Sequence, residues 1–274
     1  MKSRIIVAAI LVPLVFLLLL YLPPYALAIV LSFFSAMAAY ELLQTIMGIK
    51  GNIRICVYAM TFATLIPIGA FFELNRLILP ASLLILMSLV FIEAIARFKT
   101  DRQIPFVHML VVLFGGLAIP FTLSCLVSLR LMDGGKMLVF LPLVCAFITD
   151  SGAFFTGVLI GKHKAFPHVS PKKTVEGYVG GFVIGIAAMI FFGVGIDNLT
   201  SHDFVNYWVL LLYGVVGAAM SALGDLAFSL VKRELDIKDF GRLLPGHGGA
   251  IDRFDSLIFV IPTIYLLVTI IPAI

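Results

Sequence analysis

Long apolar runs separated by short polar stretches dominate this chain of 274 residues. Runs of about 18 residues or more are long enough to cross the hydrocarbon core of a bilayer as helices. Such runs cover roughly residues 5–22, 25–46, 53–73, 77–97, 104–128, 137–160, 178–196, 205–230 and 255–273. The pattern therefore predicts an all-α polytopic membrane protein with about nine transmembrane helices.

Composition supports that class, because 62% of the residues are hydrophobic and only 12% are charged. Cys56, Cys125 and Cys145 all fall inside predicted spans, which argues against a disulfide framework or a thiolate metal site. The first apolar run, followed by Ala26-Leu27-Ala28, resembles a secretory signal. The apolar run resumes at Ile29, however, which favours a helical hairpin turning at Pro23-Pro24.

Lysine and arginine are distributed unevenly between the two sides that nine alternating spans would create. One side receives only Arg76, Arg130 and Lys136, whereas the other 16 of the 19 basic residues fall on the side of the N-terminus. Because basic loops stay in the cytoplasm, we expect a multi-pass protein of the cytoplasmic (inner) membrane with its N-terminus inside and its C-terminus outside. The long polar loops 161–177 and 231–254 would then face the cytoplasm, where soluble nucleotides are found.

Charge is concentrated in the segment Ser229–Asp255, which reads SLVKRELDIKDFGRLLPGHGGAIDRFD. Five of the 15 acidic and five of the 19 basic residues of the chain lie in it, around a glycine-rich turn. Such a cluster between two apolar spans indicates a polyphosphate and metal site at a membrane surface.

Four acidic residues fall inside predicted spans, where ionisable groups are costly and usually face an interior cavity. Glu41 and Glu93 sit near span ends, so snorkelling to the interface or pairing with Arg97 is the simplest interpretation. Asp150 and Asp225 lie deeper, among small residues that permit a polar crevice. A functional role competes there with a buried carboxylate that pairs with a base for packing alone.

Carboxylate oxygens in this number suit a hard cation such as Mg²⁺, which takes one or two protein carboxylates and shares substrate phosphates. Asp225 and Asp252, with Asp255 or Asp239 nearby, would serve. His247 lies in the glycine-rich turn, either for a turn-stabilising hydrogen bond or for a phosphate or carbonyl contact.

The loop 161–177 contains Ser170-Pro171-Lys172-Lys173-Thr174 directly before a predicted helix. Thr174 and Glu176 are typical of helix starts, and free backbone N–H groups beside lysines bind anions well. An ordinary positive-inside loop would explain the lysines but not the Ser-Pro and Thr. Gly248 and Gly249 could likewise let backbone amides approach phosphate oxygens.

The pattern S-x-x-K-R-x4-K-D-x5-P-G-H-G-G-x-x-D-R-x-D, here Ser229–Asp255, closely resembles the signature of membrane phosphatidate cytidylyltransferases, also called CDP-diacylglycerol synthases. With the elements at 150–161 and 170–177, the resemblance extends over roughly residues 145–272. Ala250 departs from it, because larger aliphatic residues are usual at that position. We therefore divide the chain into N-terminal transmembrane helices, 1–130, and a C-terminal catalytic region, 131–274.

The resemblance implies transfer of CMP from CTP to phosphatidate, with release of pyrophosphate, by a helical homodimer whose polar cavity faces the cytoplasm. It implies Mg²⁺ held by Asp225 and Asp252 and a second, monovalent cation, and it involves no nucleic acid. We expect the chemistry to depend on Asp150, Lys173, Asp225 and Asp252. Residues expected to bind CTP or lipid phosphate are Ser170, Lys172, Lys173, Thr174, Lys232, Arg233, Lys238, Asp239, His247, Gly248, Gly249 and Arg253.

Two other functions fit parts of the pattern. A CTP-dependent polyprenol or lipid kinase would share a cation-rich site but transfer the γ-phosphate. A transporter of a phosphorylated metabolite would need basic residues on an outward path, and the outer loops hold only three.

Overall fold

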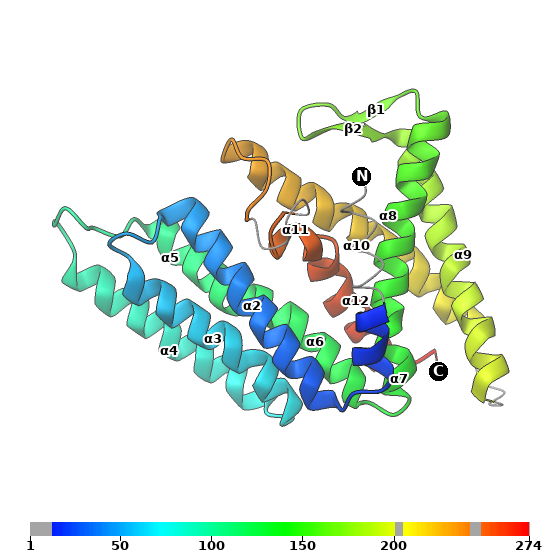
Figure 1. Ribbon diagram of the computed structural model, residues 1–274, viewed down its shortest axis with the longest axis horizontal. Coiled ribbons are helices and arrows are strands. Elements are labelled where there is room, and N and C mark those ends of the chain that lie inside the picture. The colour runs from blue at the N-terminus through cyan, green and yellow to red at the C-terminus, as the bar shows by residue number, and fades with distance from the viewer. Residues whose placement is uncertain (1–12, 201–204, 242–247, 274) are drawn as a thin grey trace. The chain divides into compact units, whose positions relative to one another are not determined.

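The structure, a computed structural model, describes residues 13–200, 205–241 and 248–273 (Figure 1). The chain forms two compact units. Unit 1 comprises residues 1–131 together with 239–253, and unit 2 comprises residues 132–238 together with 254–274. The charged segment that stands out in the sequence is therefore shared between the two units.

Seven helices among the described residues are long and apolar enough to span a membrane. Their positions confirm the prediction of an all-α polytopic membrane protein. The spans are α2 (Pro24–Met47), α3 (Ile53–Phe71), α4 (Asn75–Ala96), α5–η1–α6 (Phe106–Leu113, Phe114–Ala118, Ile119–Leu131), α7–α8 (Gly135–Leu138, Phe140–Ile160), α9 (Val175–Thr200) and α10 (Tyr207–Glu234).

The first and last predicted spans stay predictions. Residues 1–12 lie outside the described part of the chain, and residues 13–20 are helical. After the short helix α11 (Ile251–Phe254), helix α12 (Leu257–Ile270) is apolar but has only 14 residues. That is shorter than the roughly 20 residues that a perpendicular helix needs to cross the hydrocarbon core.

Unit 1 is a bundle in which the helices α2 to α6 pack side by side (Figure 1). Its main hydrophobic core includes Leu43, Ile55, Ile66 and Leu86, which are all fully buried. Many outward side chains of the same helices are equally apolar, as Ile92 on α4 illustrates with 63% exposure. Apolar residues on both faces are expected of helices surrounded by lipid.

Unit 2 is built on the pair α8 and α9, which run alongside each other (Figure 1). Small residues let their backbones approach closely, because a Cβ on Gly181 of α9 would lie only 2.8 Å from the Cβ of Ala153 on α8. Such small-residue interfaces are typical of membrane helices. Helices α10 and α12 complete this unit and also pack against each other.

The 161–177 loop forms a small β-hairpin, which the sequence pattern did not predict. Strands β1 (Lys164–Phe166) and β2 (Ser170–Thr174) are antiparallel, with Lys164 opposite Thr174. The hairpin projects beyond one end of the α8–α9 pair (Figure 1). It leads directly into α9, where the Gly177 N–H donates to Thr174 Oγ1 at 3.1 Å, so the predicted helix start at Thr174 is confirmed.

The three cysteines are buried within helices and none forms a disulfide, with Cys145 fully enclosed. Their predicted location inside the spans is confirmed.

Candidate functional site

Unit 2 contains a cavity of about 410 Å³ between α8, α9, α10 and the β-hairpin. One part of its wall is polar or charged, formed by Asp150, Ser170, Lys172, Lys173, Thr174 and Asp225. The other part is apolar and includes Phe154, Val158 and Phe182. Six residues that the sequence analysis selected thus meet in one cavity, although they are up to 75 positions apart in the chain.

An ion pair between Lys173 and Asp225 lies at the centre of the charged wall. Lys173 comes from β2 and Asp225 from α10, and their side chains are 25% and 28% exposed. The Ser229 hydroxyl lies one helical turn further along α10 and donates to Asp225 Oδ1 at 3.4 Å. The Lys173 ammonium also lies 5.6 Å from the centre of the Tyr178 ring, within range of a cation–π contact.

Burial disfavours the charged form of Lys173, but the Asp225 carboxylate and the Tyr178 side chain outweigh that effect. The pKa of Lys173 therefore lies above its usual value. The ammonium stays protonated at physiological pH, so Lys173 acts as a fixed positive charge.

Asp150 is held by two hydroxyl groups. Its Oδ1 accepts a hydrogen bond from Ser221 on α10, and its Oδ2 accepts one from Ser256 directly before α12, both at 3.0 Å. The carboxylate thereby connects three helices while it still lines the cavity. Both of these hydrogen bonds come from hydroxyl groups and not from a basic residue, while Lys173 lines the same cavity.

The hairpin is attached to α10 at a second point. Arg233 Nε donates to the Val169 carbonyl oxygen at 3.2 Å. This bond and the Lys173–Asp225 pair fix both ends of β2 against α10. Of the other expected phosphate-binding residues in unit 2, Lys238 is exposed and Lys232 is partly buried.

The remaining predicted site residues belong to the 239–253 loop of unit 1. His247 lies outside the described residues, while Asp239 and Arg253 are exposed. Asp252 is only 9% exposed, and its Oδ2 accepts hydrogen bonds from the backbone N–H groups of Phe240 at 2.9 Å and Gly249 at 3.0 Å. Asp252 therefore links Phe240 and Gly249, on either side of residues 242–247. The Gly249 N–H, which the sequence predicted to approach a phosphate oxygen, donates to this carboxylate.

Gly248 has a positive φ of 84°, a backbone conformation that residues with a side chain rarely adopt. One glycine of the glycine-rich turn is thus required by the backbone of the loop.

Glu41 is a residue of this region that the sequence analysis misjudged. It is 3% exposed, so its side chain is buried within the protein and does not extend to water, and its Oε2 accepts the Ile251 N–H at 3.2 Å. Snorkelling was therefore the wrong interpretation. An acidic residue within an apolar run was the available signal, but its partner lies 210 positions away.

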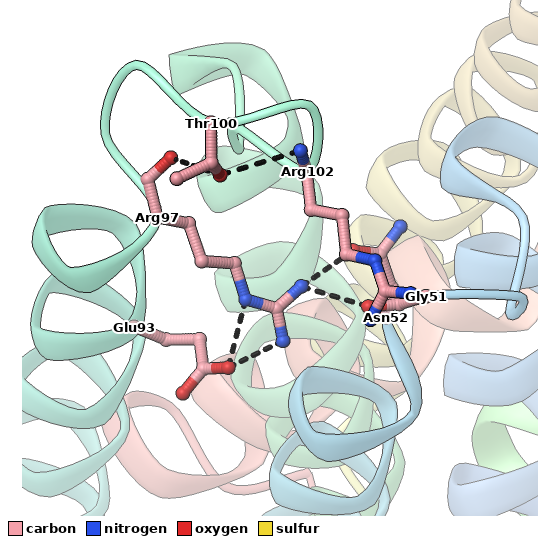
Figure 2. A network of polar contacts seen from close by, with 6 residues as sticks. All are labelled: Gly51, Asn52, Glu93, Arg97, Thr100 and Arg102. Atoms are coloured by element: carbon pink, nitrogen blue, oxygen red, sulfur yellow. Dashed lines mark hydrogen bonds and ion pairs between the residues drawn. The ribbon is translucent and has the colours of Figure 1, made fainter.

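Glu93 does pair with Arg97, as expected (Figure 2). Arg97 also donates to the Gly51 carbonyl oxygen at 2.7 Å and to Asn52 Oδ1 at 3.3 Å, while Thr100 continues the network. A second cavity of about 700 Å³ lies beside these residues in unit 1. Neither this cavity nor the network contains a predicted site residue.

Among the residues described, no three acidic, histidine or cysteine side chains gather into a metal site. Mg²⁺ needs only one or two protein carboxylates when substrate phosphates supply other ligands. Asp225 in the cavity of unit 2 fits that requirement, whereas Asp252 belongs to unit 1 and binds two amides through one oxygen.

Comparison with known proteins gives a consistent result. A phosphatidate cytidylyltransferase of Bacillus subtilis (strain 168) is 32% identical over 275 residues, covering 97% of both chains. Proteins of the same name from Staphylococcus haemolyticus and Staphylococcus aureus (strain COL) are 43% and 42% identical over 136 and 125 residues, which cover 49% and 44% of this chain and 50% and 45% of theirs. Residues 2–271 match the cytidylyltransferase family, so the chain belongs to this family.

Proposed function

We propose that this chain transfers CMP from CTP to phosphatidate, giving CDP-diacylglycerol and pyrophosphate. Membership of the cytidylyltransferase family and the names of its relatives support this activity. The observation in the structure that carries it is the Lys173–Asp225 pair in a cavity that is charged on one side and apolar on the other.

The two-sided cavity suits a phospholipid substrate. Phe154 and Val158 line it and are also 64% and 68% exposed on α8, a helix long and apolar enough to span the membrane. Acyl chains can therefore remain beside apolar residues while the phosphate reaches Lys172 and Lys173. A cavity for a soluble nucleotide alone would not need this apolar wall.

The reaction needs charge stabilisation more than proton transfer. A phosphatidate oxygen, already ionised, attacks the α-phosphorus of CTP and forms a P–O bond. The bond from the α-phosphorus to the bridging oxygen breaks, and pyrophosphate leaves with that electron pair. Lys173, held as a cation, and Lys172 lower the repulsion between the two polyanions and stabilise the developing charge.

Mg²⁺ is the cofactor that we propose, with Asp225 and Asp252 as its protein ligands. When bound, it would supply positive charge to the leaving pyrophosphate. A metal at Asp225 and a phosphate at Lys173 would replace the present ion pair, so neither buried charge would lose a partner. We assign a second, monovalent cation to the region of Asp150, whose carboxylate is oriented by two serines.

Product analysis of the purified protein with CTP, Mg²⁺ and phosphatidate tests the activity. We expect pyrophosphate and CDP-lipid in equal amounts. A lipid kinase would give CDP and a phosphorylated lipid, and a transporter would give no product. Either outcome would overturn the proposal.

We also propose that the N-terminus lies in the cytoplasm, the C-terminus outside, and that the protein is an inner-membrane homodimer. In a background without Cys56, Cys125 and Cys145, cysteines introduced at Asn198 and after Ile274 should react with an impermeant thiol reagent in intact cells. A cysteine at Lys164 should not react, and labelling there alone would invert the orientation. Native mass measurement of the purified protein decides the oligomeric state.

A further inference from the structure

A second acidic residue, Glu41, contacts the loop that carries Asp252. Helix α2 faces the 239–253 loop through Glu41 and Thr45, although the two regions are about 200 positions apart in sequence. Glu41 Oε2 accepts the Ile251 N–H at 3.2 Å. The Thr45 hydroxyl is shared between the Glu41 carbonyl oxygen of its own helix at 2.7 Å and the Phe240 carbonyl oxygen of the loop at 3.2 Å. One helix therefore holds both ends of the loop.

Two glycines of the loop, Gly241 and Gly249, pack closely against the Glu41 side chain. A Cβ placed on Gly241 would overlap Glu41 Oε1, and a Cβ placed on Gly249 would overlap Glu41 Oε2. The carboxylate fills the space that a side chain at either position would need. The Glu41 side chain therefore explains why glycine stands at both positions. For Gly249 it adds to the phosphate approach expected from the sequence.

Asp252 holds the same two stretches of backbone from within the loop. Its Oδ2 accepts the N–H groups of Phe240 and Gly249, the neighbours in sequence of Gly241 and Ala250. Glu41 packs against Gly241 and Gly249 and accepts the N–H of Ile251. A shift of the Glu41 side chain would therefore move the backbone groups that orient the Asp252 carboxylate.

Burying a carboxylate is costly, and an apolar residue would pack more cheaply at the end of an apolar helix. Glu41 is nevertheless 3% exposed. Active-site groups need positions accurate to roughly half an ångström, which requires supporting residues with fixed side chains.

We propose that Glu41 is a positioning residue, which fixes residues 239–241 and 248–253 and thereby the Asp252 carboxylate. Its effect on catalysis rests on the proposed cytidylyl transfer, whereas its effect on the loop does not. Steady-state kinetics measures the effect on catalysis, and the labelling rate of a buried cysteine measures the effect on the loop.

The first measurement is steady-state kinetics of Glu41→Ala and Glu41→Gln. Loss of the side chain should lower kcat at least about tenfold, because small displacements of reacting groups cost that much or more. The KM for phosphatidate should stay within roughly threefold, since Lys172 and Lys173, which the lipid phosphate reaches, belong to unit 2 and are unchanged. Glutamine keeps the volume and an acceptor for the Ile251 N–H, so Glu41→Gln should retain at least about a third of kcat.

Glu93→Gln is the matched control, because Glu93 is also a buried glutamate of a unit 1 helix. Its hydrogen bonds among the described residues are with Arg97 and not with the loop, so kcat of Glu93→Gln should stay within about twofold of the parent. An equal loss of kcat in Glu93→Gln and Glu41→Ala would mean that any damage to unit 1 lowers activity, and the proposal would fail.

The second measurement reports on the loop without using activity. Ala250 is 1% exposed, so a cysteine there, in a background without the three native cysteines, should react slowly with a maleimide. Glu41→Ala should raise the labelling rate at least about tenfold, as expected when local opening becomes easier by about 1.4 kcal/mol. Glu41→Gln and Glu93→Gln should leave the rate unchanged.

Unchanged labelling and unchanged kcat in Glu41→Ala would overturn the proposal. If that variant does not insert, Gly241→Ala replaces it, because its new methyl group would displace the same carboxylate and should raise labelling in the same way. If the parent protein shows no cytidylyl transfer at all, the proposed function fails, but the labelling rates still decide the role of Glu41.

Discussion

Two partly buried ion pairs in this protein have the same chemistry and different surroundings. Glu93–Arg97 joins two residues one turn apart on α4, with side chains 12% and 16% exposed. Lys173–Asp225 joins a β-strand to a helix across 52 positions of sequence, with side chains 25% and 28% exposed. The first pair is local and less exposed, the second is non-local and more exposed, and each lines a cavity of its own unit.

The partners around each pair indicate what it does. Arg97 uses its further donors on the Gly51 carbonyl oxygen and on Asn52, so the pair fixes the turn between α2 and α3 against α4 (Figure 2). Lys173 and Asp225 line a cavity together with Lys172 and Asp150. The Glu93–Arg97 pair is bound to the neighbouring turn and stabilises architecture. The Lys173–Asp225 pair is more exposed and lies among other charged residues, so it can exchange its partners for substrate and metal.

Replacement of Asp225 should have the largest effect on activity. We expect Asp225→Asn to lower kcat/KM by about 100-fold or more, because the variant loses the proposed metal ligand and leaves the Lys173 charge unpaired. The protein should still insert into the membrane. Glu93→Gln is the control, and activity above about a tenth of the parent, a loss of less than about 1.4 kcal/mol, would exclude Asp225 as an essential ligand.

Replacement of the hairpin lysines should come next. Lys173→Ala should lower kcat/KM by roughly 10–100-fold, and Lys172→Ala, whose residue is exposed, by less. Lys50→Ala and Lys99→Ala are matched controls, since the positive-inside rule treats all four lysines alike. Equal, near-parental kcat/KM in all four variants would mean that the hairpin only anchors the topology.

Replacement of Arg97 should affect stability rather than chemistry. Arg97→Ala leaves the buried Glu93 carboxylate without its partner, which should cost roughly 1–3 kcal/mol. We expect a lower unfolding temperature in detergent and kcat within about twofold of the parent. The double variant Glu93→Gln/Arg97→Ala should recover part of the stability, and a large loss of kcat at normal stability would contradict the structural role.

The smallest expected effect is a pH dependence of the stability that Lys173 contributes. Because the pKa of Lys173 is raised in the folded protein, its stabilising contribution is fully present below the unfolded value, about 10.4. It is lost only as the pH rises through the higher folded value. The stability difference between the parent and Lys173→Met should therefore be constant from about pH 7 to 9 and shrink above about pH 10.4. A difference that already shrinks near pH 8 would mean that Asp225 does not stabilise the ammonium.

The sequence by itself determined the membrane class, most span positions and the family. Hydrophobic runs report the thickness of the bilayer directly, so α2, α3 and α4 begin and end within two residues of the predicted bounds. Contacts between residues close in sequence could also be predicted, because the helix geometry alone brings them together. Glu93 and Arg97 are one helical turn apart, and Thr174 caps the helix that follows it.

Only the tertiary structure decided which distant residues meet. The pairing of Lys173 with Asp225, the two serines on Asp150 and the burial of Glu41 against the 239–253 loop all depend on how helices pack. Periodicity contains no information on such contacts, because it records which face of a helix is apolar and not which neighbour covers it. A charge inside an apolar run therefore signals that a partner exists, and the packing of the helices determines which residue that partner is.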